Sequence, residues 1–190
     1  KAISPTNAYG ATKLLAEKLV QSANAFKGKA RTKFIAVRFG NVMGSRGSVI
    51  PLFKKQILEK RFITVTDGEM NRFMMSLSEA VKLTLKAAEI GIGGELFVLK
   101  MPVIKLIDLA EVVVEEFAKK ISIEKSEIEI KHIGIRAGER MFEELMTEEE
   151  SLYSYDLGEM YVVLPTSYDR AELDKVYSSF LKTNVGSYSS

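Results

Sequence analysis

A run of strand-forming residues that follows a helical segment limits the fold of this chain most strongly. Residues 34 to 39 read Phe-Ile-Ala-Val-Arg-Phe and end at Gly40, which predicts a short buried strand. The segment before it carries apolar residues at helical spacing, namely Leu15, Leu19, Ala23 and Phe26. We therefore expect a helix with this apolar stripe facing inward, followed by a strand, which is the order typical of α/β proteins.

The rest of the chain repeats this alternation. We expect helices at residues 52–60, 76–89 and 107–119, and strands at 62–66, 95–99, 128–133 and 161–164. The second of these helices carries its apolar stripe at Val81, Leu85 and Ala88. No internal repeat and no linker divides the chain, so residues 1–190 are expected to form a single unit.

The composition excludes several classes of function. The chain has 190 residues, 46% of them hydrophobic, and a formal net charge of +2, so it can bury one ordinary core and shows no charge excess for nucleic acid. It has no cysteine and one histidine, His132, which leaves almost no material for a transition-metal site. No apolar run is long enough to span a bilayer. We expect a cytoplasmic protein without a bound metal.

Tyr9 and Lys13 are the first candidate catalytic residues. They lie four positions apart, in a segment where Pro5 fits the first helical position and Ser4 fits the cap, so we expect them on one face of a helix. A phenol with a pKa near ~10 accepts a proton poorly at neutral pH, and a close ammonium favours its phenolate form. The pair could therefore act as an acid/base, although a tyrosine packed under a solvated lysine has the same spacing.

The segment from Gly40 to Pro51 is rich in glycine but is not a dinucleotide-binding fingerprint. Its glycines stand at positions 40, 44 and 47, which departs from the G-x-G-x-x-G spacing, and Pro51 interrupts a helix start unless it lies in the first turn. Glycines still permit close approach of a backbone to a phosphate group. We interpret the segment as a ligand-binding loop, with a plain connection as the alternative.

Four segments in order resemble one family. They read Lys-Ala-Ile-Ser-Pro-Thr-Asn-Ala-Tyr-Gly-Ala-Thr-Lys (1–13), Arg-Phe-Gly-Asn-Val-Met-Gly-Ser-Arg-Gly-Ser-Val-Ile-Pro (38–51), Met-Asn-Arg-Phe (70–73) and Arg-Ala-Gly-Glu-Arg-Met-Phe-Glu-Glu-Leu (136–145). This order resembles extended short-chain dehydrogenase/reductases, in the branch of UDP-N-acetylglucosamine 4,6-dehydratases of capsule and flagellin-glycan synthesis. The chain departs from the family pattern at Asn71, Ala137 and Arg140, where the family has Thr, Pro and Lys. The resemblance implies an α/β fold, the C-terminal part of a Rossmann-like enzyme with its nucleotide-sugar-binding region.

The resemblance also implies roles for individual residues. Tyr9 would take a proton from the sugar O4, Lys13 would hold the cofactor ribose, and Lys1 would act at C5 and C6. The implied substrate contacts are Asn41 to the diphosphate or sugar, Ser48 and the backbone of Val49, Ile50 and Pro51 along the base, Arg72 and Arg136 at the phosphates, and Glu139 beside the ribose. We expect the two arginines to converge on one cavity next to Asn41.

The implied reaction is the NADP-dependent dehydration of UDP-N-acetylglucosamine to a 4-keto-6-deoxy sugar, with inversion at C5 and with NAD as the alternative cofactor. Two other functions stay open, a nucleotide-sugar 4-epimerase and a non-catalytic nucleotide-sugar-binding fragment. The chain begins inside the first motif and lacks a glycine fingerprint, so the N-terminal cofactor-binding part is expected to be absent. We expect the 190 residues alone to be inactive, and the protein to be a homo-oligomer.

Overall fold

The computed structural model describes residues 2–45, 47–136, 138–165, 170–183 and 185–190, with the backbone alone for residues 170–172. It consists of two compact units, and each is built from separate stretches of the chain. Unit 1 comprises Lys1–Phe39, Ser78–Met101 and Glu144–Ser189, and unit 2 comprises Gly40–Leu77, Pro102–Glu143 and Ser190. Because the chain passes several times from one unit to the other, no single linker separates them.

Unit 1 is organised around a five-stranded sheet with the strand order β1-β5-β10-β9-β11. Strand β1 pairs in parallel with β5, whereas β10, β9 and β11 join the sheet by antiparallel pairing. A separate antiparallel pair is formed by β8 and β12. The elements of unit 1 are α1 (Ala8–Phe26), β1 (Ala36–Arg38), α3 (Leu77–Ile90), β5 (Leu96–Leu99), β8 (Glu144–Met146), α5 (Glu148–Ser151), β9 (Ser154–Asp156), β10 (Met160–Val163), α6 (Arg170–Tyr177), β11 (Leu181–Lys182) and β12 (Tyr188–Ser189).

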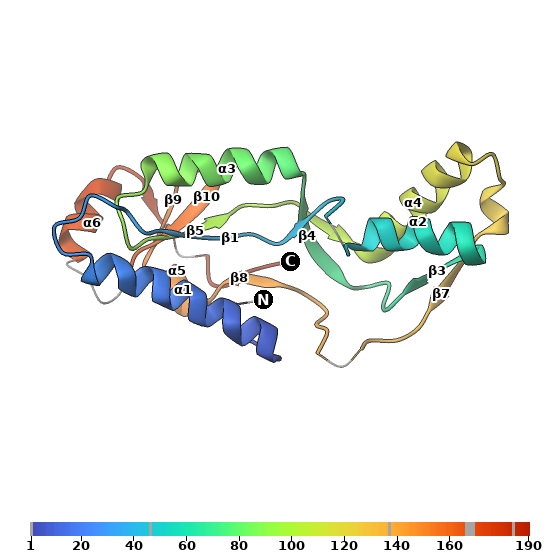
Figure 1. Ribbon diagram of the computed structural model, residues 1–190, viewed down its shortest axis with the longest axis horizontal. Coiled ribbons are helices and arrows are strands. Elements are labelled where there is room, and N and C mark those ends of the chain that lie inside the picture. Colours follow the sequence, from blue (N-terminus) through green and yellow to red (C-terminus); the bar gives the residue numbers. More distant parts are fainter. Residues whose placement is uncertain (1, 46, 137, 166–169, 184) are drawn as a thin grey trace. The chain divides into compact units, whose positions relative to one another are not determined.

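The strands expected at 34–39, 95–99 and 161–164 are confirmed, each slightly displaced or shortened. Every residue of β5 and β10 is buried, which explains why both segments are continuous apolar runs. Figure 1 shows α3 along one margin of unit 1 and α1 along the other, with β1 and β5 between them.

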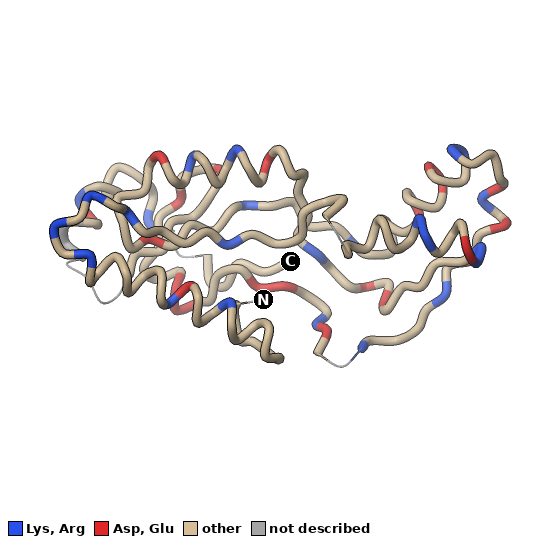
Figure 2. Tube along the Cα trace, in the orientation of Figure 1, with Lys and Arg blue, Asp and Glu red and all other residues tan. Residues whose placement is uncertain are grey.

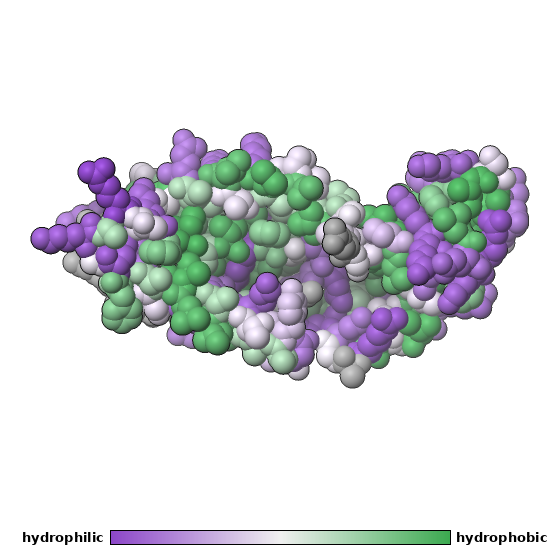
Figure 3. Space-filling view, viewed as in Figure 1, coloured by the Kyte–Doolittle hydropathy of each residue, from purple (hydrophilic) through white to green (hydrophobic). Residues whose placement is uncertain are grey.

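The apolar stripe expected to face inward on α1 is instead largely exposed, and so is the stripe on α3. Leu15 and Leu19 are about 60% exposed, and Phe26 is 87% exposed. The buried residues of α1 are Gly10, Glu17 and Asn24; those of α3 are Ala80, Leu83 and Ala87. Figure 3 shows apolar side chains at the surface along α3. Helical spacing identifies an apolar face, but the side of α1 that packs carries a glycine and two polar residues.

Unit 2 contains a three-stranded sheet, a two-stranded parallel pair and two helices. The three-stranded sheet has the order β2-β4-β6, and β3 pairs in parallel with β7. The elements are β2 (Asn41–Val42), α2 (Val49–Lys60), β3 (Phe62–Val65), β4 (Asn71–Met75), β6 (Val103–Lys105), α4 (Leu106–Lys120), the 3-10 turn η1 (Lys125–Glu127) and β7 (Glu129–His132). The sequence predicted α2, β3, α4 and β7 but missed β2, β4 and β6.

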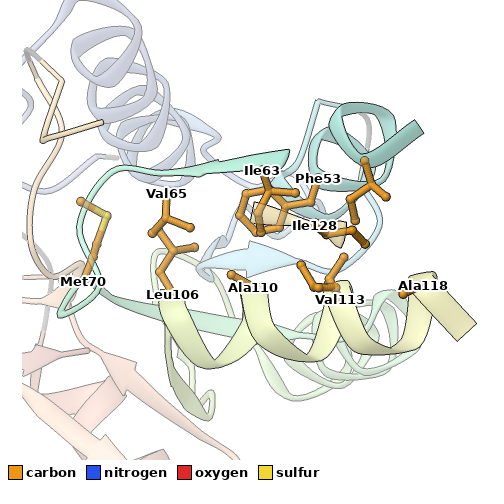
Figure 4. Packing of buried hydrophobic residues seen from close by; sticks show 11 residues of the cluster. Phe53, Ile63, Val65, Met70, Leu106, Ala110, Val113, Ala118 and Ile128 are labelled. Carbon is orange, nitrogen blue, oxygen red and sulfur yellow. The ribbon is translucent and has the colours of Figure 1, made fainter. Parts of the chain in front are cut away.

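The core of unit 2 lies between α2, α4 and the β3-β7 pair. Phe53, Ile57 and Ile63 are completely buried, and Val113 and Ile128 pack beside them (Figure 4). The helical spacing of Phe53 and Ile57 correctly predicted that both face inward. Acidic and basic side chains lie close together along α4 and the turn after it (Figure 2), where Lys119 pairs with Glu115 and Glu116. Acidic residues outnumber basic ones there.

Candidate active site

Tyr9 and Lys13 are neighbours on one face of α1. The Lys13 Nζ atom lies 5.3 Å from the centre of the Tyr9 ring, which is the approach of a cation over an aromatic face. Tyr9 is 56% exposed and Lys13 is also exposed, so both can reach a ligand. The juxtaposition that the four-residue spacing predicted is therefore present.

The start of α1 differs from the prediction. The helix begins at Ala8, three residues after Pro5, and its N-cap is Asn7. The Asn7 Oδ1 atom accepts a hydrogen bond from the Gly10 backbone N–H at 2.9 Å. Asparagine is a strong N-cap because this bond satisfies an amide that the helix leaves unpaired. Ser4 has a φ of 43° and is not the cap. The cap therefore places Tyr9 in the first turn of α1.

A buried charge network holds α1 against the sheet of unit 1. Arg38 in β1 donates from Nε and Nη2 to the two carboxylate oxygens of Glu17, both at 2.7 Å. It also donates to Glu150 at 2.7 and 2.8 Å and to the Leu145 carbonyl at 3.1 Å. Burial by itself would lower the pKa of Arg38, but the two carboxylates raise it, so the guanidinium stays charged. Helix α1 is thus held to β1 by a buried ion pair.

Asn41, the first of the expected substrate contacts, lies in β2 and is held by its neighbours. Its Nδ2 donates to the Phe73 carbonyl at 3.0 Å and to Oε2 of Glu143 at 2.8 Å. The same Glu143 oxygen accepts the Phe73 backbone N–H at 3.3 Å. No role was predicted for Glu143 from the sequence. Its place in the Arg136–Leu145 motif, seven residues after Arg136, was the feature that could have indicated one.

Ser48 and the three residues after it form the start of α2. The helix was expected to begin at Leu52, but it begins at Val49, so Val49, Ile50 and Pro51 make up its first turn. Pro51 is tolerated there because the first-turn N–H groups have no partner within a helix. Ser48 occupies the N-cap position, and its buried Oγ has no hydrogen-bond partner among the described residues. A ligand at this turn would meet helical N–H groups, not a loop.

Arg72 in β4 directs its guanidinium at the protein backbone. Its Nη1 donates to the carbonyls of Asn71 at 2.6 Å and Met141 at 3.3 Å, and its Nη2 donates to the Arg140 carbonyl at 2.9 Å. Arg72 therefore holds the segment that follows Arg136, which is four positions before Arg140. A contact of Arg72 with a diphosphate would have to replace some of these hydrogen bonds.

Arg136 and Glu139 form a tight exposed turn. The Glu139 N–H donates to the Arg136 carbonyl at 3.0 Å, and the Arg136 N–H donates to the Glu139 carboxylate at 3.4 Å. Both side chains are exposed, whereas Ala137 lies outside the described residues. The turn therefore presents one cation and one carboxylate at the surface of unit 2.

The expected site residues divide between the two units. Tyr9 and Lys13 belong to unit 1, whereas Asn41, Ser48, Arg72, Arg136 and Glu139 belong to unit 2. Within unit 2, the segment 140–143 contacts both Arg72 and Asn41, so it links two of the expected substrate contacts. Lys1 lies outside the described residues.

The described residues contain no group of three or more His, Cys, Asp or Glu side chains that could hold a metal ion. A hollow of about 520 Å³ lies between the end of α4 and η1, lined by residues such as Lys119 and Lys125. Another of about 290 Å³ lies between α2 and α4, and of the expected site residues it includes Ile50. Neither hollow is lined by Tyr9, Asn41 or Arg136. No helix in the described part of the chain has the length and apolar character needed to cross a membrane.

Unit 1 pairs β1 in parallel with β5 beside helices, and α1 carries a Tyr-x-x-x-Lys pair, as in extended short-chain dehydrogenase/reductases. A family model described as "Polysaccharide biosynthesis protein" matches residues 1–165. The chain belongs to this family.

Three similar proteins support the assignment. An "Uncharacterized membrane protein" of Methanocaldococcus jannaschii is 51% identical over 93% of this chain and 53% of its own length. A "UDP-N-acetylglucosamine 4,6-dehydratase (inverting)" of Campylobacter jejuni is 41% identical over 87% of this chain and 47% of its own length. The crystal structure of Pen from Bacillus thuringiensis is 50% identical, with a TM-score of 0.86 over 99% of this chain and 54% of that chain. The chain thus spans about half the length of these relatives.

Proposed function

We propose that this chain supplies the acid/base pair and the nucleotide-sugar contacts for the dehydration of UDP-N-acetylglucosamine to a UDP-4-keto-6-deoxy-hexosamine. The observation that carries the proposal is the Tyr9–Lys13 pair at the start of α1, with Lys13 Nζ 5.3 Å from the Tyr9 ring. The proposal is supported by the 41% identity to an inverting 4,6-dehydratase. The reaction would be that of a lyase in surface-glycan synthesis.

The chain's own residues would handle the protons. Tyr9 would accept the O4 proton of the sugar as the C4 hydrogen leaves, and Lys13 beside it would hold the cofactor ribose. A nicotinamide cofactor, NADP or NAD, would supply the hydride acceptor for C4 and, after water is lost, the hydride that C6 receives in the 4-keto-6-deoxy product. The C4 ketone acidifies the C5 hydrogen, so loss of that proton and of the C6 hydroxyl eliminates water. Lys1 is the proposed residue for this elimination.

The nucleotide-sugar would be held by unit 2. Arg136 presents an exposed guanidinium suited to a phosphate, and Glu139 beside it presents a carboxylate suited to ribose hydroxyls. The first turn of α2 offers backbone N–H groups, and the buried Ser48 hydroxyl beside it has no hydrogen-bond partner among the described residues. For Arg136 and Glu139, the assignments extend the family resemblance to side chains that the structure leaves accessible.

The test joins this chain to the part of the Campylobacter jejuni dehydratase that it does not match, and incubates the product with UDP-N-acetylglucosamine and NADP. We expect a nuclear magnetic resonance spectrum that shows a C6 methyl group and a C4 ketone. A spectrum that instead shows an intact C6 hydroxyl group and an inverted configuration at C4 would reject dehydration. The unmodified Campylobacter enzyme serves as the positive control.

A 4-epimerase is the second candidate, because a relative named UDP-glucose 4-epimerase, from Rickettsia felis, is 41% identical over 85% of this chain. Such an enzyme needs the Tyr9 step but no proton loss at C5. A third candidate is a nucleotide-sugar-binding protein without activity. Titration of the 190-residue chain with UDP and with NADP tests this third candidate. A binding fragment is expected to bind UDP but not NADP.

A further inference from the structure

Ser190, which follows β12, is hydrogen-bonded to two segments that are far from it in the sequence. Its backbone N–H donates to the Glu143 carbonyl at 2.8 Å. Its Oγ accepts the Glu143 backbone N–H at 2.8 Å and donates to the Asn71 carbonyl at 3.3 Å. A hydroxyl can accept and donate at the same time, so one side chain makes both contacts. Ser190 thereby binds both backbone polar groups of Glu143 and joins them to the first residue of β4.

The segment that Ser190 holds comprises residues 140–143, which follow the turn at 136–139. Within this segment, the Met141 carbonyl also accepts the Asn71 N–H at 2.9 Å. All of these residues belong to unit 2. The described residues of the turn are exposed, so its placement depends on the segments that enter and leave it. Ser190 fixes the segment on the leaving side.

The side chain of Glu143 is placed by the same backbone contacts. Its Oε2 accepts the Asn41 amide at 2.8 Å and the Phe73 N–H at 3.3 Å. A carboxylate can bridge two strands in this way only while its own backbone stays in place. Ser190 therefore supports two parts of unit 2, the base of the exposed turn and the carboxylate between β2 and β4.

We propose that Ser190 is a positioning residue of the nucleotide-sugar site, whose hydroxyl fixes residues 140–143 and so places Arg136 and Glu139 for the ligand without contacting it. This inference rests on the proposed function, which assigns a phosphate to Arg136 and the ribose to Glu139. Ser190 lies outside the four segments that carry the family resemblance, since the last of them ends at Leu145.

The test compares Ser190→Thr with Ser190→Val, because threonine and valine have the same shape and differ in the hydroxyl. Dissociation constants of UDP-N-acetylglucosamine are measured by calorimetry for the 190-residue chain and both variants. We expect Ser190→Val to bind about 5-fold more weakly than Ser190→Thr, since the Glu143 N–H loses its acceptor. Ser190→Ala, which adds no bulk, should show the same weakening relative to the unmodified chain. Equal affinities within both pairs would overturn the inference.

A control at Tyr188 separates positioning from a general loss of stability. The Tyr188 hydroxyl accepts the Met101 N–H at 2.8 Å and donates to the Met101 carbonyl at 3.2 Å, both within unit 1. Tyr188→Phe should lower the urea concentration at the midpoint of unfolding but leave the affinity for UDP-N-acetylglucosamine within about 2-fold. Equal weakening of ligand binding by Tyr188→Phe and Ser190→Val would indicate a general loosening and would overturn the role of Ser190.

Hydrogen exchange of the Glu143 amide tests the anchoring without any ligand. The amide should exchange about 5-fold faster in Ser190→Val than in Ser190→Thr, because its acceptor is missing. Equal exchange rates would contradict the anchoring. If the unmodified chain does not bind UDP-N-acetylglucosamine, the proposed function fails and the inference fails with it. If the unmodified chain binds and the variants bind equally well, only the role of Ser190 is wrong.

Discussion

The guanidinium of Arg38 and the carboxylate of Glu17 form a buried two-point ion pair, with both N–O distances at 2.7 Å. Each side chain is less than 10% exposed. The pair joins β1 to the middle of α1, eight residues after Tyr9. Since α1 buries little apolar surface, this contact decides how the helix is rotated on the sheet, and thereby where Tyr9 and Lys13 point.

Replacing Arg38 with methionine should destabilise unit 1 strongly. The change would leave the carboxylates of Glu17 and Glu150 without their cation, and breaking a buried pair costs about 3–5 kcal/mol. Urea denaturation of the variant measures the loss. The matched control is Lys119→Met on α4, whose ion pairs with Glu115 and Glu116 are exposed and screened by solvent, so that it should change stability far less. An equal loss of stability in Arg38→Met and Lys119→Met would contradict the prediction that the buried ion pair matters more than the exposed one.

The stability of the fold should depend on pH through the ionisation of Glu150. Burial alone would raise the pKa of Glu150, but the hydrogen bond and charge of Arg38 outweigh it and hold the pKa below the ordinary value of 4.5. A carboxyl whose pKa is lower in the folded state stabilises the fold above pH 4.5, and this contribution is lost as the pH falls through the folded pKa. The urea concentration at the midpoint of unfolding of the wild-type chain should therefore decrease as the pH is lowered below about 4.5. Glu150→Gln should flatten that drop; an unchanged pH profile would exclude Glu150 as its source.

Gly93 should be intolerant of a side chain. A Cβ atom at this position would lie 2.4 Å from Oδ1 of Asn24, and the φ of +121° already disfavours any other residue. We expect Gly93→Ala to cost more than about 2 kcal/mol, by overpacking and backbone strain together. Gly158 has a φ of +83° and open space around its Cβ position, so Gly158→Ala should cost about 1 kcal/mol. Thermal unfolding should show a larger decrease in Tm for Gly93→Ala than for Gly158→Ala.

Tyr9→Phe should abolish turnover in the joined enzyme while UDP affinity stays nearly unchanged. The phenol would act on the sugar O4 proton, whereas the nucleotide would be held by unit 2. Product formation and the dissociation constant of UDP are measured in parallel for the wild type and the variant. Undiminished turnover in the variant would remove Tyr9 from the proposed acid/base role.

The 190-residue chain should bind NADP weakly or not at all. A dinucleotide is usually held by a glycine-rich turn between a strand and a helix, and the glycine-rich segment here has a different spacing. Its residues fall instead in β2 and at the start of α2. Calorimetric titration with NADP provides the measurement, with UDP as the comparison ligand. Stoichiometric NADP binding would show that this expectation is wrong.

Spacing and composition determined much of the fold. Period-four patterns predicted that Tyr9 and Lys13 are neighbours and that Phe53 and Ile57 face the core of unit 2, because helical geometry alone brings such residues together. The strand-forming residues at 95–99 and 161–164 predicted strands for the same local reason. Short two- and three-residue strands such as β2 and β6 were missed, since segments of that length carry almost no periodic signal.

The tertiary structure decided which partners the polar residues take. Nothing local shows that Arg38 meets Glu150, 112 positions away, or that Asn41 meets Glu143, 102 positions away. The second of these contacts also sets the orientation of the Asn41 amide. Helical and strand periods are properties of neighbouring residues, and the sequence expresses them directly. The pairing of a buried charge or amide depends on where the folded chain brings an acceptor, and that is fixed only when the distant segments pack together.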